Sequence, residues 1–107
     1  MPQADLSYSA TLQFDAAAVL AKVEEVVTAY DASSGECKGR AHPLAVTHHD
    51  HVLLRLRMLE KPHRDDAFMQ GLLAVLSDAL EPMIPVPSIL GIELGFLERH
   101  YASRTRA

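Results

Sequence analysis

The stretch VLLRLRML (residues 52–59) alternates along its whole length. Every second side chain is a large apolar one, and two of the positions between them are arginines, Arg55 and Arg57. Successive side chains of a strand point to opposite faces, so this period of two predicts a strand with one buried face. The face that carries the arginines must meet water, anions or an acid such as Glu93 on a neighbouring strand. The stretch therefore predicts a strand in a sheet that is covered on one face only.

Upstream of this stretch, the sequence predicts a strand, a helix and a second strand. Polar and apolar residues alternate over 3–13, which indicates a half-buried strand. Asp15 is expected to cap a helix, because apolar residues recur at steps of three and four over 19–30. Residues 40–47 predict a short strand, and Pro43 within it is typical of a sheet edge.

Downstream, a second helix and a last strand follow. Asp65 or Asp66 is expected to cap the helix, where an acid also suits the positive end of the helix dipole. Apolar residues over 68–80 give this helix one buried side, and a run of prolines beyond them ends it. Residues 89–97 alternate again and predict the final strand, which leads into a polar tail.

The order of these elements predicts a single α+β domain over residues 1–107, with two similar β-α-β halves at about 1–47 and 48–98. Parallel strands joined by a helix cross over in the right-handed sense, so one four-stranded sheet with two helices on one face is expected. The other face is expected to be uncovered, apolar in places and buried against another copy of the chain. A ferredoxin-like ligand-binding domain shares this element order but usually pairs its strands antiparallel, and stays an alternative.

Composition excludes several classes of function. The net charge of −4 argues against a nucleic-acid binder, which would carry a basic face. Cys37 is the one cysteine, so no internal disulfide can form, as is usual in a reducing cytosol. The opening carries an acid early and no long apolar run, and no stretch approaches the roughly 18 apolar residues of a membrane span. We therefore expect a soluble cytoplasmic protein without membrane or nucleic-acid partners.

Pro2 follows Met1 directly. A start methionine is normally removed when residue 2 is small, and proline would then be the mature N-terminus, with a secondary amine. A free α-amino group titrates at about pH 7.7–8.0, and desolvation or a nearby guanidinium lowers its pKa towards the range that suits a general base. Taken alone, a proline at this position is usually incidental or merely stiffens the start of an edge strand, so the catalytic interpretation needs support from the rest of the chain.

The run HHDH (residues 48–51) contains side chains that bind transition metals. Consecutive residues of an extended segment point to opposite sides, so these four cannot all converge on one ion. No second cluster lies at a spacing typical of zinc sites. The sequence therefore predicts a polar loop here and no metal.

The chain resembles the tautomerase superfamily and, within it, the 5-carboxymethyl-2-hydroxymuconate isomerases. The Met-Pro start and the repeated β-α-β pattern carry most of this resemblance, which covers nearly the whole chain. His63 and Ser7 depart from the pattern, because glycine and an acid are common at their places. The further matching stretches are LSYS (6–9) with Thr11-Leu12, VLAKV (19–23), His49-Asp50 ahead of a strand, and IELGFLE (92–98).

The resemblance implies a homotrimer with active sites near the subunit boundaries and with no metal or cofactor. It implies that the Pro2 nitrogen is the general base, which moves a proton on an unsaturated 2-hydroxy (enol) or 2-oxo acid in the breakdown of aromatic compounds. It also implies that Arg40 and Arg64 bind the carboxylates of a dicarboxylate or keto acid substrate. An arginine fork suits that task, because it makes two hydrogen bonds to a planar carboxylate and stays charged.

Two alternatives to an isomerase stay open on the sequence. The first is a trimeric binding or structural relative that keeps the fold without turnover. The second is a proline-dependent hydratase or dehalogenase. Removal of Met1 and turnover of a small enol acid by the protein would separate the enzymes from the binding relative.

Overall fold

The central pair of the sheet is β1 (Gln3–Ser9) and β3 (His51–Met58), which run antiparallel to each other. β2 (Lys38–Leu44) pairs parallel to β1 at one edge, and β4 (Ile89–Phe96) pairs parallel to β3 at the other. The computed structural model describes all 107 residues of the chain, and its strand order is β2-β1-β3-β4. Parallel pairing at both edges does not fit the antiparallel pairing of the ferredoxin-like alternative.

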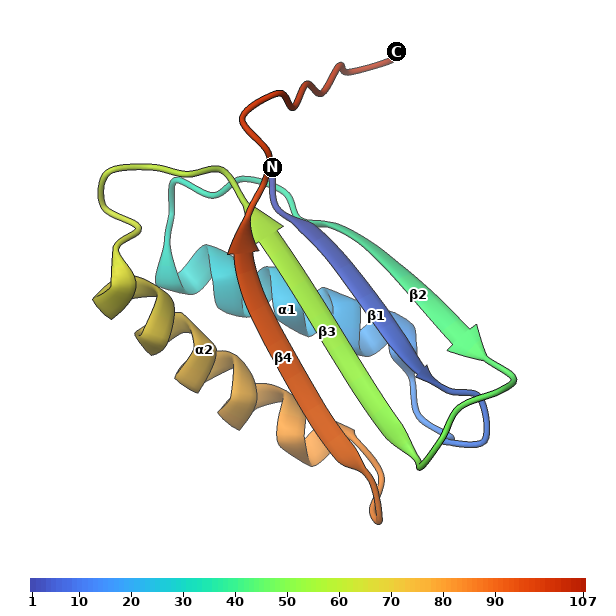
Figure 1. Ribbon diagram of the computed structural model, residues 1–107. Coiled ribbons are helices and arrows are strands. Elements are labelled where there is room, and N and C mark those ends of the chain that lie inside the picture. The colour runs from blue at the N-terminus through green and yellow to red at the C-terminus, as the bar shows by residue number, and fades with distance from the viewer.

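Two helices of 15 residues each, α1 (Ala16–Tyr30) and α2 (Asp66–Leu80), cover the same face of the sheet (Figure 1). Each helix joins two parallel neighbouring strands, as the sequence predicts, and a short 3-10 helix, η1 (Glu81–Met83), follows α2. The α+β class, the mixed four-stranded sheet and the two helices are therefore confirmed. Neither helix is long and apolar enough to cross a membrane.

The expected caps begin both helices. The Asp15 carboxylate accepts a hydrogen bond from the Ala18 backbone N–H at 3.0 Å, and the Asp65 carboxylate accepts one from the Phe68 N–H at 2.9 Å. Each cap satisfies a backbone donor that the helix leaves free, and losing one costs about 1 kcal/mol. Of the two candidates for the second cap, Asp65 is the one used.

The first strand is shorter than its alternating pattern predicts. It ends at Ser9 because the chain turns there, and the Leu12 N–H donates to the Ser9 carbonyl at 3.0 Å. The second strand begins earlier than expected, at Lys38, whose N–H donates to the Pro2 carbonyl at 2.9 Å. Pro2 is thus tied into the sheet one residue ahead of β1.

The hydrophobic core lies between the sheet and the two helices. The alternating side chains of β3, from Val52 to Met58, are each no more than 1% exposed, and they pack against apolar residues four positions apart on α1 and α2. Burying one such side chain stabilises the fold by about 1.5–3 kcal/mol. The helix residues that complete this core are Val19, Val23, Val27, Leu72, Leu76 and Leu80.

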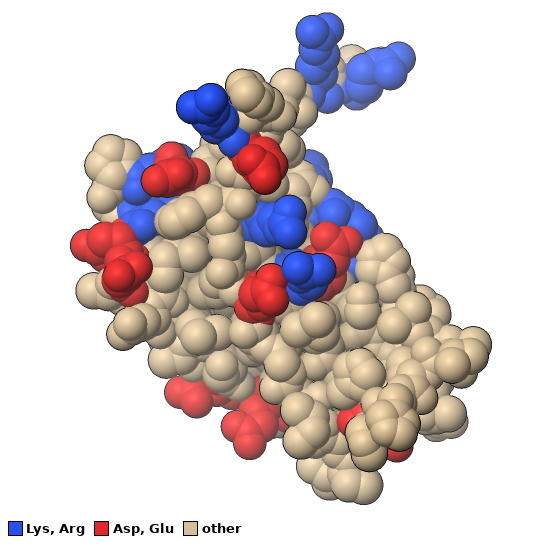
Figure 2. Space-filling model, viewed as in Figure 1, with Lys and Arg blue, Asp and Glu red and all other residues tan.

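The uncovered face of the sheet carries ion pairs between neighbouring strands. Asp5 contacts Arg40 at 3.2 Å, and Arg55 contacts Glu93 at 3.2 Å, as its register across from Glu93 predicts. Figure 2 looks onto this face: blue and red side chains alternate over its upper half, whereas its lower half shows no blue and only scattered red patches. Ion pairs between neighbouring strands thus occupy the half of this face nearest the chain N-terminus, as expected for a face that is apolar only in places.

Candidate active site

Pro2 lies at the end of the sheet where β1 and β2 begin and where β3 and β4 end (Figure 1). Its side chain is less than 2% exposed, and its carbonyl is bonded to Lys38. Ala4 and Leu6, two and four residues further on, face the core, so the proline ring lies on the helix-covered side of the sheet. Met1, by contrast, is 38% exposed.

A cavity of about 480 Å³ lies at the same end of the sheet, and Pro2 itself is not among the residues that line it. Met1 and Gln3, the chain neighbours of Pro2, line one wall, together with Glu36 and Lys38 at the entry into β2. The opposite wall consists of Tyr101 and residues 103–106, which belong to the segment that follows β4. Residues near the N-terminus and residues near the C-terminus therefore line the same cavity, which lies at one end of the sheet.

Two hydrogen bonds hold the segment after β4 against this end of the sheet. The Leu97 N–H donates to the Met58 carbonyl at 2.8 Å, which continues the pairing of β4 with β3. The Gln3 side-chain amide donates to the Tyr101 hydroxyl at 3.0 Å. Together these bonds place the following residues across from the start of β1.

The cavity lining carries an excess of positive charge. Three of its side chains are basic, and its one acid, Glu36, lies 2.5 Å from the Lys38 ammonium. The Lys38 ammonium lowers the pKa of the Glu36 carboxyl, and Glu36 in turn raises the pKa of Lys38. Arg104 and Arg106 have no acidic partner. A small anion would therefore meet two uncompensated guanidinium groups in this cavity.

Arg40 lies close to the cavity but does not line it. Its guanidinium donates to Asp5 at 3.2 Å, to the Lys38 carbonyl at 3.3 Å and to the Gln3 side-chain oxygen. Gln3 thus stands between Arg40 and the cavity. Burial alone would raise the pKa of Asp5, but the hydrogen bond to His42 and the charge of Arg40 lower it overall.

Arg64 is held inside the protein. Its side chain is 2% exposed, its Nε and Nη2 donate to Asp31 at 3.0 and 2.9 Å, and its Nη1 donates to the Leu59 carbonyl at 2.6 Å. The Asp31 carboxylate also accepts from His63 and Ser33. Burial would raise the pKa of Asp31, but these hydrogen bonds hold it far below its usual value. The structure does not bring Arg64 to the cavity beside Pro2, and its substrate-binding role stays a prediction.

Cys37 lies next to this cavity in the chain but is not poised as a nucleophile. Burial and the nearby Glu24 carboxylate raise the pKa of its thiol to about 11, so the thiol stays protonated at neutral pH. Its backbone N–H donates to Glu24 at 2.8 Å. Cys37 is therefore a neutral, partly buried side chain just before the start of β2.

The segment 48–51 forms the entry into β3. The rings of His48 and His49 lie with their centres 4.1 Å apart and their planes tilted by 50°, and His49 has a left-handed backbone with φ of 64°. His51 turns its Nδ1 to the His49 carbonyl at 3.0 Å. No group of three or more His, Cys, Asp or Glu side chains in the chain is placed to hold a metal ion.

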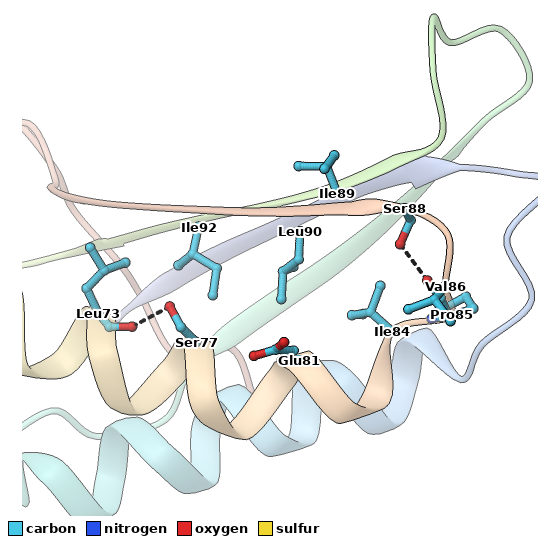
Figure 3. A pocket seen from close by; sticks show the side chains of 10 residues that line it. All are labelled: Leu73, Ser77, Glu81, Ile84, Pro85, Val86, Ser88, Ile89, Leu90 and Ile92. Carbon is cyan, nitrogen blue, oxygen red and sulfur yellow. Dashed lines mark hydrogen bonds between the residues drawn. The ribbon is translucent and has the colours of Figure 1, made fainter.

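A second cavity, of about 450 Å³, lies between α2 and β4 (Figure 3). Leu73 and Ser77 reach it from the helix, and Leu90 and Ile92 reach it from the strand. Its one titratable side chain is Glu81, and no basic residue lines it. This cavity is therefore less suited to a carboxylate substrate than the cavity beside Pro2.

The sequence analysis does not identify the residues that line the far wall of the Pro2 cavity. It describes the last residues only as a polar tail, although Arg104 and Arg106 stand two positions apart in a segment without acids. That spacing and the local excess of basic residues are the signal that could have found them. Lys38 gives no comparable signal, because its place beside Pro2 follows from the pairing of β1 with β2.

The fold and the cavity define a small α+β protein built of two β-α-β units, with a buried proline beside a basic cavity. No protein-family model matches the sequence. No curated protein matches it either. Its relationship to known proteins therefore has to be judged from solved structures.

Solved structures of isomerases share this fold. A 5-carboxymethyl-2-hydroxymuconate delta-isomerase superposes with a TM-score of 0.75 at 15% identity, over 99% of this chain and 89% of that one. A 5-carboxymethyl-2-hydroxymuconate isomerase from Deinococcus radiodurans R1 gives 0.70 at 18% identity, over 99% and 90%. A protein described as a probable enzyme from the thermophilic fungus Aspergillus fumigatus gives 0.66 at 16%, over 97% and 80%. At these identities the likeness shows a shared fold.

Proposed function

We propose that this chain is a cofactor-free isomerase of an unsaturated 2-hydroxy or 2-oxo acid, with the nitrogen of Pro2 as the general base. The observation that carries the proposal is the burial of Pro2 between Met1 and Gln3, two residues that line a cavity with two uncompensated arginines. Two solved structures with the same fold are described as 5-carboxymethyl-2-hydroxymuconate isomerases, which supports the same class of reaction. We place the reaction in the cytoplasmic breakdown of aromatic compounds.

The proposal requires that Met1 is removed. Met1 lines the cavity, so its loss would open the space in front of the proline nitrogen and convert an amide into a free secondary amine. The bond from the Lys38 N–H to the Pro2 carbonyl would still hold the ring in place. Burial of the ring and the nearby positive charges both disfavour the protonated amine, which leaves it free to accept a proton near neutral pH.

In the proposed reaction, the Pro2 nitrogen takes a proton from the enol or from the carbon next to the carbonyl. It returns that proton at another position of the conjugated system, so the double bond moves and no atom is gained or lost. Positive charge in the cavity stabilises the carboxylate and the enolate that develops. Arg40 can also bind the substrate carboxylate if it exchanges its half-exposed ion pair with Asp5 for one with the substrate. Arg64 would have to leave the buried Asp31 carboxylate, so we expect its main role to be structural.

We further propose that the chain works as a homotrimer with its active sites near the subunit boundaries. β4 is an edge strand, so one row of its backbone groups has no partner within the chain. Ile89, the first residue of β4, is 70% exposed, and Val86, three residues before it, is 90% exposed. Both line the cavity of Figure 3. A second copy would cover this surface. Light scattering should give three times the 11.7 kDa mass of one chain, and Ile89→Lys should lower it.

An assay with a panel of small 2-hydroxydienoates tests the catalytic role of Pro2. We expect wild-type protein to convert the enol to the conjugated ketone. The rate of Pro2→Ala should be lower by about 10²–10⁴-fold, which is the usual contribution of a general base. Ser77→Ala, which alters only the cavity between α2 and β4, is the matched control and should keep its rate. Circular dichroism should show the same fold in all three proteins. Equal rates for wild type and Pro2→Ala would reject the proposal. Addition of water to the dienoate would indicate the hydratase alternative, and release of halide from a halogenated analogue assayed in parallel would indicate the dehalogenase alternative.

A further inference from the structure

The segment after β4 concentrates positive charge at one place in an acidic chain. Residues 99–107 contain three arginines and no acid, whereas the net charge of the chain is −4. Figure 2 shows the blue side chains of the projecting segment standing apart from any red neighbour. Two of these arginines, Arg104 and Arg106, line the cavity beside Pro2. A locally uncompensated charge that faces a cavity is available to a ligand.

Three of the four arginines of the sheet and core differ in this respect, whereas Arg57 of β3 also has no acidic partner but does not line the cavity. Arg40, Arg55 and Arg64 each lie within 3.2 Å of an acidic side chain. The cavity also has one acid, Glu36, but the Lys38 ammonium already contacts it. No carboxylate of the chain therefore occupies the forks of the two cavity arginines.

The segment is anchored at its start. Leu97 continues the pairing with β3, and Tyr101 accepts a hydrogen bond from Gln3, whereas residues 102–107 beyond this point are exposed. Lys38 also lines the cavity. An anion in the cavity would lie between a lysine from β2 and arginines from the C-terminal segment.

We propose that Arg104 and Arg106, with Lys38 opposite them, form a carboxylate-binding site that holds the end of the substrate remote from Pro2. The assignment rests on the proposed function, because it deepens the description of the same cavity. Guanidinium forks hold a planar carboxylate through two parallel hydrogen bonds, and the cavity of about 480 Å³ is large enough for a small organic acid. The C-terminal segment thus selects substrates that carry a second carboxylate.

Binding of an unreactive dicarboxylate tests this site without any turnover. Succinate is titrated into the full chain and followed through the backbone amide signals of Gln3, Lys38 and Tyr101, with butyrate as the monocarboxylate of similar size. We expect succinate to bind more tightly than butyrate, and R104Q/R106Q to weaken succinate binding about tenfold or more, as expected for the loss of charged hydrogen bonds. Arg99→Gln is the matched control, because Arg99 belongs to the same segment but does not line the cavity, and it should stay within twofold of wild type.

Two outcomes would overturn the assignment. One is equal succinate affinity in wild type and R104Q/R106Q. The other is a loss of oligomer mass in R104Q/R106Q with unchanged succinate affinity, which would show that the arginines contact another copy of the chain. The proposed function has a separate test, because Pro2→Ala should lower turnover strongly and leave succinate binding intact. If Pro2→Ala kept full turnover while R104Q/R106Q lost succinate binding, the anion site would stand and the base would be wrong.

Discussion

Two clusters of the same three residue types occupy opposite environments in this protein. Asp31 binds Arg64 and His63 in the interior, and Asp5 binds Arg40 and His42 on the open face of the sheet. The side chains of Asp31 and Arg64 are 8% and 2% exposed, whereas those of Asp5 and Arg40 are 41% and 42% exposed.

This difference in exposure determines what each arginine can do. A buried pair loses several kcal/mol if one partner leaves, because the other charge stays without water or counter-ion. An exposed pair contributes about 0–1 kcal/mol, so its partners exchange readily. Arg64 is therefore committed to the fold, and Arg40 is free to take part in binding.

The largest effect is expected when Arg64 loses its charge. Arg64→Met leaves the Asp31 carboxylate buried with two of its five hydrogen bonds gone, and we expect the free energy of unfolding to fall by about 3–5 kcal/mol. Urea denaturation measures this change. Arg104→Gln, on the exposed segment, serves as the control and should change stability by less than about 0.5 kcal/mol. A loss of less than 1 kcal/mol in Arg64→Met would remove the distinction between the two clusters.

The buried cluster should also make the fold sensitive to acid. The pKa of Asp31 is far below its usual value in the folded state, so its contribution to stability is complete above about pH 4 and is lost as the pH falls further. One such group changes the free energy of unfolding by at most about 1.4 kcal/mol per pH unit. Denaturation of wild type and Asp31→Asn between pH 2 and pH 7 should show a shallower decline for the variant. Parallel curves would contradict the assigned protonation of Asp31.

The comparison shows where sequence reasoning succeeds. The alternation over β3, the steps of three and four in both helices, and the caps at Asp15 and Asp65 are local patterns, and each element forms close to its predicted place. The parallel edges follow from the same order, because a helix that joins two strands brings them side by side in one direction.

The candidate site is much less predictable, because its residues meet through long-range contacts. Arg64 and Asp31 are 33 positions apart, and no period links them, so the sequence shows an arginine at a loop but not its buried partner. Tyr101 meets Gln3 across 98 positions, which is why the arginines after it are not expected beside Pro2. Only the pairing of the strands and the path of the chain after β4 make these contacts visible.

Arg40 should affect binding more than stability. Arg40→Gln removes a half-exposed ion pair, and we expect the free energy of unfolding to change by less than about 1 kcal/mol. If Arg40 leaves Asp5 to bind a substrate carboxylate, KM should rise by about tenfold while kcat changes little, the pattern of lost ground-state binding. Steady-state kinetics with an enol acid that the wild-type protein converts measures KM and kcat separately. An unchanged KM would limit Arg40 to its pair with Asp5.

The smallest effect is expected at Asp5 itself. Asp5→Asn keeps the shape of the side chain and removes the charge that holds Arg40 and His42, so stability should change by about 0.5 kcal/mol or less. Because the variant frees Arg40, KM for an anionic substrate should stay equal or fall. Thermal unfolding and the same kinetic assay measure both quantities. A rise in KM would indicate that Asp5 positions Arg40 for binding.

The central claim is that Pro2 provides a free, sheltered amine beside fixed positive charge. Its most direct test is the intact mass of the purified protein, followed by a pH titration of the protein labelled with ¹⁵N-proline. The account predicts a mass without Met1 and a Pro2 nitrogen that titrates below the usual range of about 7.7–8.0 for a free α-amino group. A retained Met1, or a Pro2 nitrogen that titrates within or above that range, would contradict it.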